Sequence, residues 1–283
     1  MDTTSIAAML YFTTLRIQTD LTTGTAFIFY HEWYSKKVSN VVSGYFLVTN
    51  KHVVPKTIEQ LSFSFTAQAV DEYAPDFNQV IPVTLRGIHA RQWFGHPSDE
   101  VDVTVFPLQM TLNKVSDKGQ HPYITKITAD NFPSEENLKA LNAIEDILFI
   151  GYPNGIYDKE NNLPIVRRGS TASFPIVDYN GEPKFLIDAS VFPGSSGSPV
   201  FVYNAGSWIE DGAAVLGRER VIFLGVLSSV LYRETDGSVE FREIPATVET
   251  IVKTKEMIDL GVAYKARTIM EAVEDFLRRH GEI

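Results

Sequence analysis

The sequence predicts an all-β fold of two packed β-barrels, followed by a helical extension at the C-terminus. Short segments rich in valine, isoleucine, threonine and aromatic residues alternate with polar turns over most of the chain, which is typical of strands. A long irregular stretch, residues 109–145, divides these segments into two groups. Two strand-rich halves joined by a longer linker indicate two barrels packed together.

The first group predicts strands over residues 10–18, 25–31, 44–49, 61–65, 80–86 and 101–108. In the irregular stretch, residues 134–144 are compatible with a short helix that Ser134 would cap. The second group predicts strands over residues 147–151, 165–168, 174–178, 185–189, 198–203, 221–231 and 239–242. We therefore expect one barrel over residues 1–125, a second over residues 126–243 and a helical extension over residues 244–283.

The C-terminal extension carries two helical patterns. The first ends at Gly261, a natural helix stop, and its apolar face comprises Val248, Ile251, Val252 and Ile258. In the second, Thr268 and Glu271 have the spacing of a capping box. Its apolar stripe comprises Ile269, Ala272, Val273, Phe276 and Leu277. We expect this second helix to pack on its own domain rather than on a partner.

Composition argues against several classes of function. The 25 basic and 35 acidic residues give a net charge of −10, which disfavours nucleic-acid binding as the main task. The chain has no cysteine, which excludes disulfides and thiolate chemistry and favours a reducing compartment. Asp2 lies where a secretion signal would carry positive charge, and no window approaches the ~18 apolar residues of a membrane span. We expect a soluble cytoplasmic protein that binds neither nucleic acid nor membrane.

The strongest chemical signal is FPGSSGSP at residues 192–199. A serine hydroxyl becomes an effective nucleophile where a tight turn exposes its Oγ and backbone N–H groups face the developing oxyanion. Gly194 and Gly197 lie on either side of Ser196 and permit that close backbone approach. The alternative is a Gly/Ser/Pro surface turn. Predicted strands on both sides and two partner motifs upstream favour the nucleophile.

Two upstream motifs supply the groups that a nucleophilic serine needs. His52, one of six histidines, ends an apolar strand and begins a turn, where a rigid imidazole can reach a cleft as a general base. Asp102 opens the apolar run DVTVFPL, where a carboxylate is costly unless it is paired. Accepting a histidine N–H would satisfy it and fix the histidine tautomer. Asp99 and Glu100 are alternatives, but they precede the apolar run and fit a solvated loop.

These motifs resemble those of the chymotrypsin/trypsin-like serine peptidases, over roughly residues 10–231. His52 lies in TNKHV, where Asn50 replaces the family's usual small residue, and the order His, Asp, Ser is the family's own. Residues 22–28, TTGTAFI, resemble the strand before the family's histidine. Residues 150–155, 167–169 and 187–194 are similar to the bacterial HtrA-like catalytic domain, although too few residues follow Leu231 for a PDZ domain.

The resemblance implies two six-stranded, chymotrypsin-like barrels and a serine endopeptidase that acts through an acyl-enzyme, without metal or organic cofactor. It implies a catalytic triad of His52, Asp102 and Ser196, and an oxyanion hole of the backbone N–H groups of Gly194 and Ser196. The residues implied in binding a peptide or protein substrate are Ser190, Ser228, Ser229 and Val230. Because no acid lies at the base of the implied S1 pocket, we expect a small or medium apolar P1 residue.

Ser195 stands where pancreatic-type members carry the aspartate that pairs with a freed N-terminus, so this alignment excludes activation by that ion pair. The oxyanion hole is then either preformed or ordered by another contact, for which the C-terminal helix and a regulatory protein partner are candidates. A latent or catalytically silent fold that binds peptides or proteins in a cytosolic assembly is the alternative function. A hydrolase of small esters is a further alternative.

Overall fold

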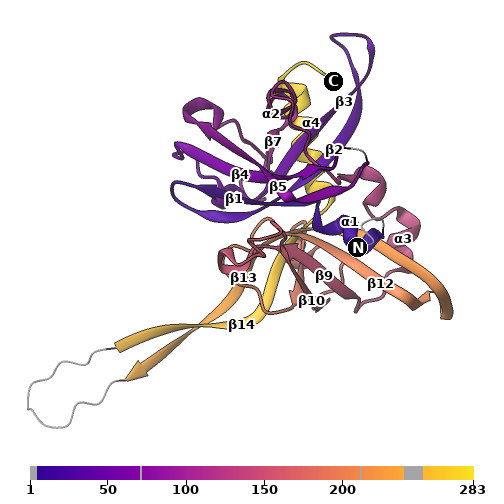
Figure 1. Cartoon of the computed structure of the whole chain (residues 1–283). Coiled ribbons are helices and arrows are strands. Elements are labelled where there is room, and N and C mark those ends of the chain that lie inside the picture. Colours follow the sequence, from indigo (N-terminus) through magenta and orange to yellow (C-terminus); the bar gives the residue numbers. More distant parts are fainter. Residues whose placement is uncertain (1–4, 71, 211, 239–250) are drawn as a thin grey trace, which may run out of the picture.

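The structure is a computed structural model that describes residues 5–70, 72–210, 212–238 and 251–283. Two β-sheets dominate it, as predicted, and they pack against each other (Figure 1). One core cluster contains residues from both sheets, including Phe27 and Phe46 of the first and Ile150 and Phe223 of the second. The interface between the two lobes is therefore a continuous apolar core rather than a solvated hinge.

The first sheet has the order β5-β4-β1-β2-β3-β7-β6, with β8 paired to β2. Its strands are β1 (Thr14–Thr19), β2 (Thr23–Ser35), β3 (Asn40–Thr49), β4 (Gln60–Gln68), β5 (Pro75–Arg86), β6 (Phe94–Gly95), β7 (Thr104–Pro107) and β8 (Ile127–Thr128). Among the described residues this sheet thus has eight strands, where six were expected. The sequence did not predict β6 or β8, because two residues are too few to show a period-two pattern.

The second sheet is a closed barrel with the expected six strands, in the order β10-β11-β14-β13-β12-β9. They are β9 (Asp146–Gly151), β10 (Ile165–Thr171), β11 (Lys184–Asp188), β12 (Pro199–Glu210), β13 (Ala213–Ser238) and β14 (Ile251–Lys265). Beyond the barrel, β13 and β14 continue together as a long two-stranded ribbon that projects from the body of the molecule (Figure 1).

Two elements predicted for the C-terminal half are wrong. Residues 174–178 form no strand and lie in the connection between β10 and β11. The helix predicted to end at Gly261 is replaced by β14, which pairs with β11 on one edge and with β13 on the other. Pairing on two edges outweighs the helical periodicity, so the barrel includes residues assigned to the helical extension. Residues 239–242 and Val248 lie outside the described residues.

Four α-helices accompany the sheets in the described part of the chain. They are α1 (Ile6–Tyr11), α2 (Gln109–Ser116), α3 (Glu135–Ala140) and α4 (Arg267–Arg279). The predicted cap of α3 is confirmed, because the Ser134 hydroxyl accepts the Asn137 N–H at 3.0 Å. The predicted capping box of α4 is wrong, because the Thr268 hydroxyl donates to the Lys265 carbonyl instead. None of the described helices is long and apolar enough to cross a membrane.

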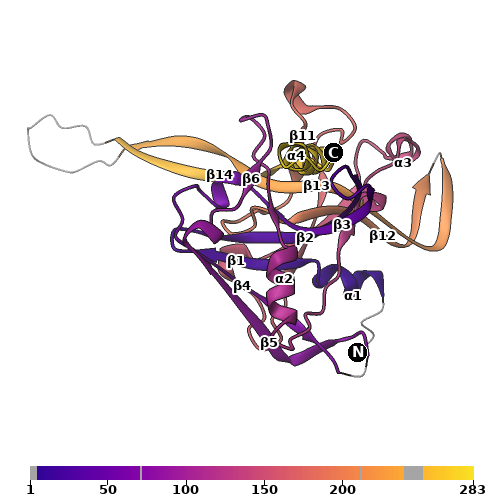
Figure 2. The same cartoon turned by 90° about the horizontal axis from the view of Figure 1, so that it is seen from above.

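Helix α4 packs on its own chain, as predicted. It follows β14 directly and contacts β6 and β7 of the first sheet (Figure 2). Its predicted apolar stripe is the contact surface, in which Phe276 is partly buried and the other members are fully buried. The helix that follows the second barrel therefore packs against β6 and β7 of the first sheet, the two strands joined by the loop that contains Asp102 (the Asp102 loop, residues 96–103).

We expect Leu277→Ala to lower the free energy of unfolding by about 2–5 kcal/mol, because the Leu277 side chain is fully buried and its removal leaves a cavity. Urea denaturation measures the change. Leu216→Ala is the matched control, because Leu216 is 71% exposed and its truncation is expected to cost less than about 0.5 kcal/mol. Equal losses for the two variants would contradict the packing described for α4.

Candidate active site

The first sheet brings His52 and Asp102 together. His52 lies in the short 3-10 turn Lys51–Val53 that follows β3, and Asp102 lies just before β7. Strands β3 and β7 are antiparallel neighbours in which Thr49 pairs with Thr104, so the two loops leave the sheet side by side. The Asn50 side-chain amide joins them by donating to the Asp102 backbone carbonyl at 2.7 Å. The residue that departs from the family pattern thus ties the two loops together.

The Asp102 carboxylate binds His52 twice. Its Oδ2 lies 2.6 Å from His52 Nδ1, and its Oδ1 accepts the His52 backbone N–H at 3.2 Å. An ionised carboxylate only accepts hydrogen bonds, so Nδ1 carries the proton. In the neutral imidazole Nε2 then keeps its lone pair and can accept a proton. The His52 side chain is half exposed, so this nitrogen can be reached from solvent.

The environment of Asp102 favours its ionised form. Burial raises the pKa of Asp102. The hydrogen bonds and charge of His52 and the hydrogen bond from the Ser228 hydroxyl lower this pKa by more than burial raises it, so the net pKa lies below the ordinary value of 3.8. The Ser228 hydroxyl donates to Asp102 Oδ2 at 2.7 Å. The neighbouring acids Asp99 and Glu100 are exposed, as the sequence predicted.

Ser196 comes from the second barrel, in the turn between β11 and β12. Its Oγ donates to the Ser228 backbone carbonyl at 2.8 Å. Among the described residues, no hydrogen bond joins Ser196 Oγ to His52. Ser228, on β13, therefore contacts both Asp102 and Ser196. A continuous series of hydrogen bonds links His52, Asp102, Ser228 and Ser196.

The two glycines beside Ser196 are required by the backbone. Gly194 has φ +89° and Gly197 has φ +88°, in the left-handed region that favours glycine. A Cβ at Gly194 would lie 2.5 Å from the Tyr152 carbonyl oxygen, and one at Gly197 would overlap the Thr25 carbonyl oxygen. The turn that presents Ser196 thus lies directly against the backbone of both lobes.

The backbone N–H groups of Gly194 and Ser196 are both available. The Pro193 carbonyl accepts the Asn154 N–H at 2.6 Å. A trans peptide points its carbonyl and its N–H in opposite directions, so the Gly194 N–H points away from Asn154. Within the described residues, neither N–H donates to a protein acceptor.

The implied substrate-binding residues lie at the start of the ribbon. Ser229 and Val230 of β13 pair with Val262 and Gly261 of β14. Strand β12 pairs with β13 only as far as Val226, so the second edge of β13 has no strand partner beyond that residue in the described part of the chain. Ser190 is half-buried and lies shortly after β11. The free edge of β13 therefore begins next to Ser228, whose backbone carbonyl accepts the hydrogen bond from the Ser196 hydroxyl.

Several contacts of the site were missed by the sequence analysis. The Thr25 hydroxyl donates to the Gly194 carbonyl at 2.9 Å, although Thr25 belongs to the segment TTGTAFI that the analysis singled out. The C-terminal segment also holds the Asp102 loop, through a hydrogen bond from the Tyr264 hydroxyl to the Glu100 carbonyl at 2.8 Å. His96 of the same loop lies 2.7 Å from Glu271 of α4. Nothing in the sequence pattern marks these last two contacts.

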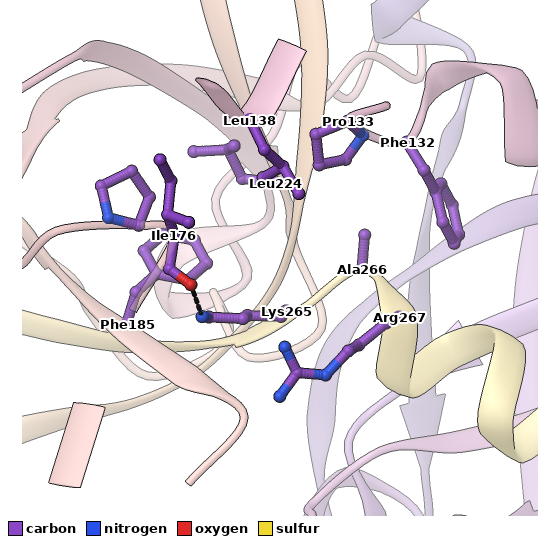
Figure 3. A pocket seen from close by; sticks show the side chains of 10 residues that line it. Phe132, Pro133, Leu138, Ile176, Phe185, Leu224, Lys265, Ala266 and Arg267 are labelled. Atoms are coloured by element: carbon purple, nitrogen blue, oxygen red, sulfur yellow. Dashed lines mark hydrogen bonds between the residues drawn. The ribbon is translucent and has the colours of Figure 1, made fainter. Parts of the chain in front are cut away.

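The described residues hold no group of three or more His, Cys, Asp or Glu side chains that could bind a metal ion. A pocket of about 130 Å³ lies where β14 passes into α4 (Figure 3). Its walls are mainly apolar, and Lys265 Nζ within it donates to the Ile176 carbonyl at 2.8 Å and pairs with Asp178 at 2.6 Å. None of the predicted site residues lines it, so it is not the implied S1 pocket.

Two solved structures are among those to which this chain is similar. One is Rv3671c from M. tuberculosis H37Rv, a serine-to-alanine mutant in an inactive form, at 15% identity over 97% of this chain and 90% of that one, with a TM-score of 0.45. The other is the scabies mite inactivated protease paralogue S-I1, at 13% identity over 95% of this chain and 96% of that one, with a TM-score of 0.43. No curated protein matches the sequence.

The sequence model described as the trypsin-like peptidase domain matches residues 24–209, about two thirds of the 283-residue chain. The matched segment includes His52, Asp102 and Ser196. It begins within β2 of the first sheet and extends into β12 of the second barrel, so it spans both lobes. The chain belongs to the trypsin-like peptidase family.

Proposed function

We propose that this protein is a serine endopeptidase with Ser196 as nucleophile, His52 as general base and Asp102 as the group that orients His52. The observation that carries the proposal is the series of hydrogen bonds through Ser228, which connects the His52–Asp102 pair to Ser196 across the two lobes. A structural serine turn has no need of an oriented imidazole and a partly buried carboxylate beside it.

The reaction begins with a change of partner for the nucleophile. Rotation about χ1 moves the Ser196 hydroxyl from the Ser228 carbonyl to His52 Nε2, which takes its proton as Oγ attacks the scissile carbonyl. Asp102, held ionised by its lowered pKa, stabilises the imidazolium that forms. The N–H groups of Gly194 and Ser196 bind the developing oxyanion. His52 then protonates the leaving amine, and water hydrolyses the acyl-enzyme.

We propose that the substrate is an extended peptide or protein segment that pairs with the free edge of β13 at Ser228, Ser229 and Val230. An unpaired strand edge presents the backbone donors and acceptors that an extended peptide needs. Ser190 would lie at the base of the S1 pocket, where its small side chain leaves room for an apolar P1 residue. The absence of cysteine supports action in the cytoplasm.

A second candidate function is a latent protease or a silent binding module. One observation favours it, because the Ser196 hydroxyl donates to the Ser228 carbonyl rather than to His52. In this case a regulatory protein partner would shift the Ser196 side chain, or peptides would bind along β13 without being cleaved.

Incubation with a mixed peptide library, followed by mass spectrometry, tests the proposal. We expect internal cleavage by the wild type, mainly after small or medium apolar residues, and none by Ser196→Ala. Peptides that are retained by both proteins but cleaved by neither would support the binding module instead. Cleavage confined to Arg at P1 would contradict the proposed specificity, and cleavage that survives in Ser196→Ala would contradict the proposed nucleophile.

A further inference from the structure

Thr25 is a fully buried residue of β2, in the first sheet. It contacts the turn of the second barrel that carries Ser196, residues 193–198, which we call the nucleophile turn. Its hydroxyl donates to the Gly194 carbonyl at 2.9 Å and accepts the Tyr152 N–H at 3.1 Å. Its own backbone N–H donates to the Ser196 carbonyl at 2.9 Å. One residue of the first lobe thus holds two successive parts of the turn that carries the proposed oxyanion donors.

The hydroxyl contact fixes a particular peptide plane. The Gly194 carbonyl belongs to the peptide that joins Gly194 to Ser195, which lies between the two proposed donors. Holding this carbonyl sets ψ of Gly194, and the contact to the Ser196 carbonyl fixes the turn on the far side of the second donor. The directions of both N–H groups relative to each other therefore depend on Thr25.

Thr25 is itself rigidly held. The Thr49 hydroxyl donates to the Thr25 carbonyl at 2.6 Å, and Thr25 pairs with Arg16 of β1 within the sheet. Because Thr25 is buried and held by Thr49 and by its pairing with β1, its position does not adjust to the nucleophile turn, and it can fix the position of that turn.

The side chain of the turn that could have provided an anchor does not do so. Ser195 is buried, at 1% exposure, and its hydroxyl has no hydrogen-bond partner among the described residues. The main contacts of α4 with other elements are those with β6, β7 and β14. The Pro193 and Gly194 carbonyls accept their hydrogen bonds from the Asn154 N–H and from the Thr25 hydroxyl. Beyond Ser196, the turn is also bonded to β13, where the Gly197 N–H donates to the Leu227 carbonyl at 2.8 Å and the Leu227 N–H donates to the Ser198 carbonyl at 2.9 Å.

We propose that the Thr25 hydroxyl is a positioning group that keeps the oxyanion donors of Gly194 and Ser196 preformed, without an ion pair from a newly freed N-terminus. The kinetic consequences of this inference rest on the proposed peptidase function. The ordering of the turn by Thr25 does not depend on that function.

The test compares Thr25→Val, which keeps the shape and loses the hydroxyl, with Thr25→Ser, which keeps the hydroxyl. Thr171→Val is the matched control, because Thr171 is also buried and its hydroxyl also makes two backbone hydrogen bonds, to Glu145 and Ala143. Thr171 lies on β10, in the second barrel that also carries Ser196, but outside the turn between β11 and β12. Thermal unfolding identifies any variant that does not fold.

For Thr25→Val we expect kcat to fall about 10–100-fold with little change in KM, because only transition-state stabilisation is lost. Affinity for a peptide aldehyde, which forms an oxyanion adduct, should fall in parallel. Thr25→Ser should recover most of the activity, and Thr171→Val should keep the wild-type kcat. An unchanged kcat in Thr25→Val, or an equal loss in Thr171→Val, would overturn the inference.

Hydrogen exchange of the peptide that spans residues 193–198 gives a readout that does not require turnover. We expect faster exchange in Thr25→Val than in the wild type and Thr171→Val. If the wild type shows no peptidase activity but exchange responds in this way, the proposed function fails and the ordering role of Thr25 stands. Equal exchange in all variants would overturn the ordering role, whatever the activity of the wild type.

Discussion

Ser196→Ala is expected to lower kcat/KM for a cleaved peptide by roughly 10⁴-fold or more, with the fold unchanged. The substitution removes the hydroxyl that would form the acyl-enzyme, and residual rate would come only from substrate binding and oxyanion contacts. The lost hydrogen bond to the Ser228 carbonyl is a single contact at a partly exposed site, so stability should change by less than about 1.5 kcal/mol. Initial rates and thermal unfolding measure the two effects separately.

Ser195→Ala is the matched control for this result. The two serines are adjacent, but the Ser195 hydroxyl is buried and has no partner among the described residues, so its removal leaves no unsatisfied group behind. We expect the rate of Ser195→Ala to stay within a few-fold of wild type. Comparable losses in the two variants would mean that the turn is disturbed as a whole and would remove the case for Ser196 as nucleophile.

Asp102→Asn is expected to lower kcat by about 10⁴-fold. An amide can donate a hydrogen bond to Nδ1, which would move the proton to His52 Nε2 and leave no lone pair facing Ser196. Because the side chain is almost unchanged in shape, the hydrogen bond between the loops through Asn50 should persist. Asp99→Asn and Glu100→Gln are the controls, since both side chains are exposed, and wild-type rates are expected for them. A large loss of kcat in either control would indicate that Asp99 or Glu100, and not Asp102, is the acid that orients His52.

The same variant has an expected signature in the pH dependence of stability. The pKa of Asp102 lies below 3.8 in the folded protein, so its ionised form stabilises the fold at neutral pH, and this stabilisation is lost as the pH falls through the folded pKa. The difference in free energy of unfolding between wild type and Asp102→Asn should therefore shrink as the pH drops below about 3.8. Urea denaturation over this range measures it. A difference that grows on acidification would contradict the lowered pKa.

Elements with strong local patterns could be predicted from the sequence, and elements defined by pairing could not. Strands β2, β3, β9 and β11 are clear because their apolar residues are concentrated between turn signals. Strand β14 was predicted as a helix, because its apolar spacing also fits a 3.6-residue period and only its pairing with β11 and β13 decides the outcome. The six residues of α1 are too few for a helical period to be distinguished from the start of a strand.

In the candidate site, too, residues in short motifs could be predicted from the sequence, whereas contacts between distant parts of the chain could not. His52, Asp102 and Ser196 each lie in a short motif, so the sequence identifies them individually. The contact of Thr25 with Gly194 joins residues 169 positions apart, and no local pattern records it. Ser228 was predicted only as a wall of the substrate pocket, whereas its hydroxyl binds Asp102 and its carbonyl binds Ser196. Such contacts follow from the packing of the two lobes, which a single sequence does not display.

Labelling by a fluorophosphonate, with the modified residue located by mass spectrometry, tests the central claim most directly. The account predicts that the folded wild type takes up one equivalent of the probe on Ser196, because only an activated serine beside oxyanion donors reacts with it. Labelling should be lost in Ser196→Ala, in His52→Ala and after denaturation. A well-folded wild type that stays unlabelled, or that is labelled at a different residue, would contradict the claim that His52, Asp102 and Ser196 form a competent catalytic triad.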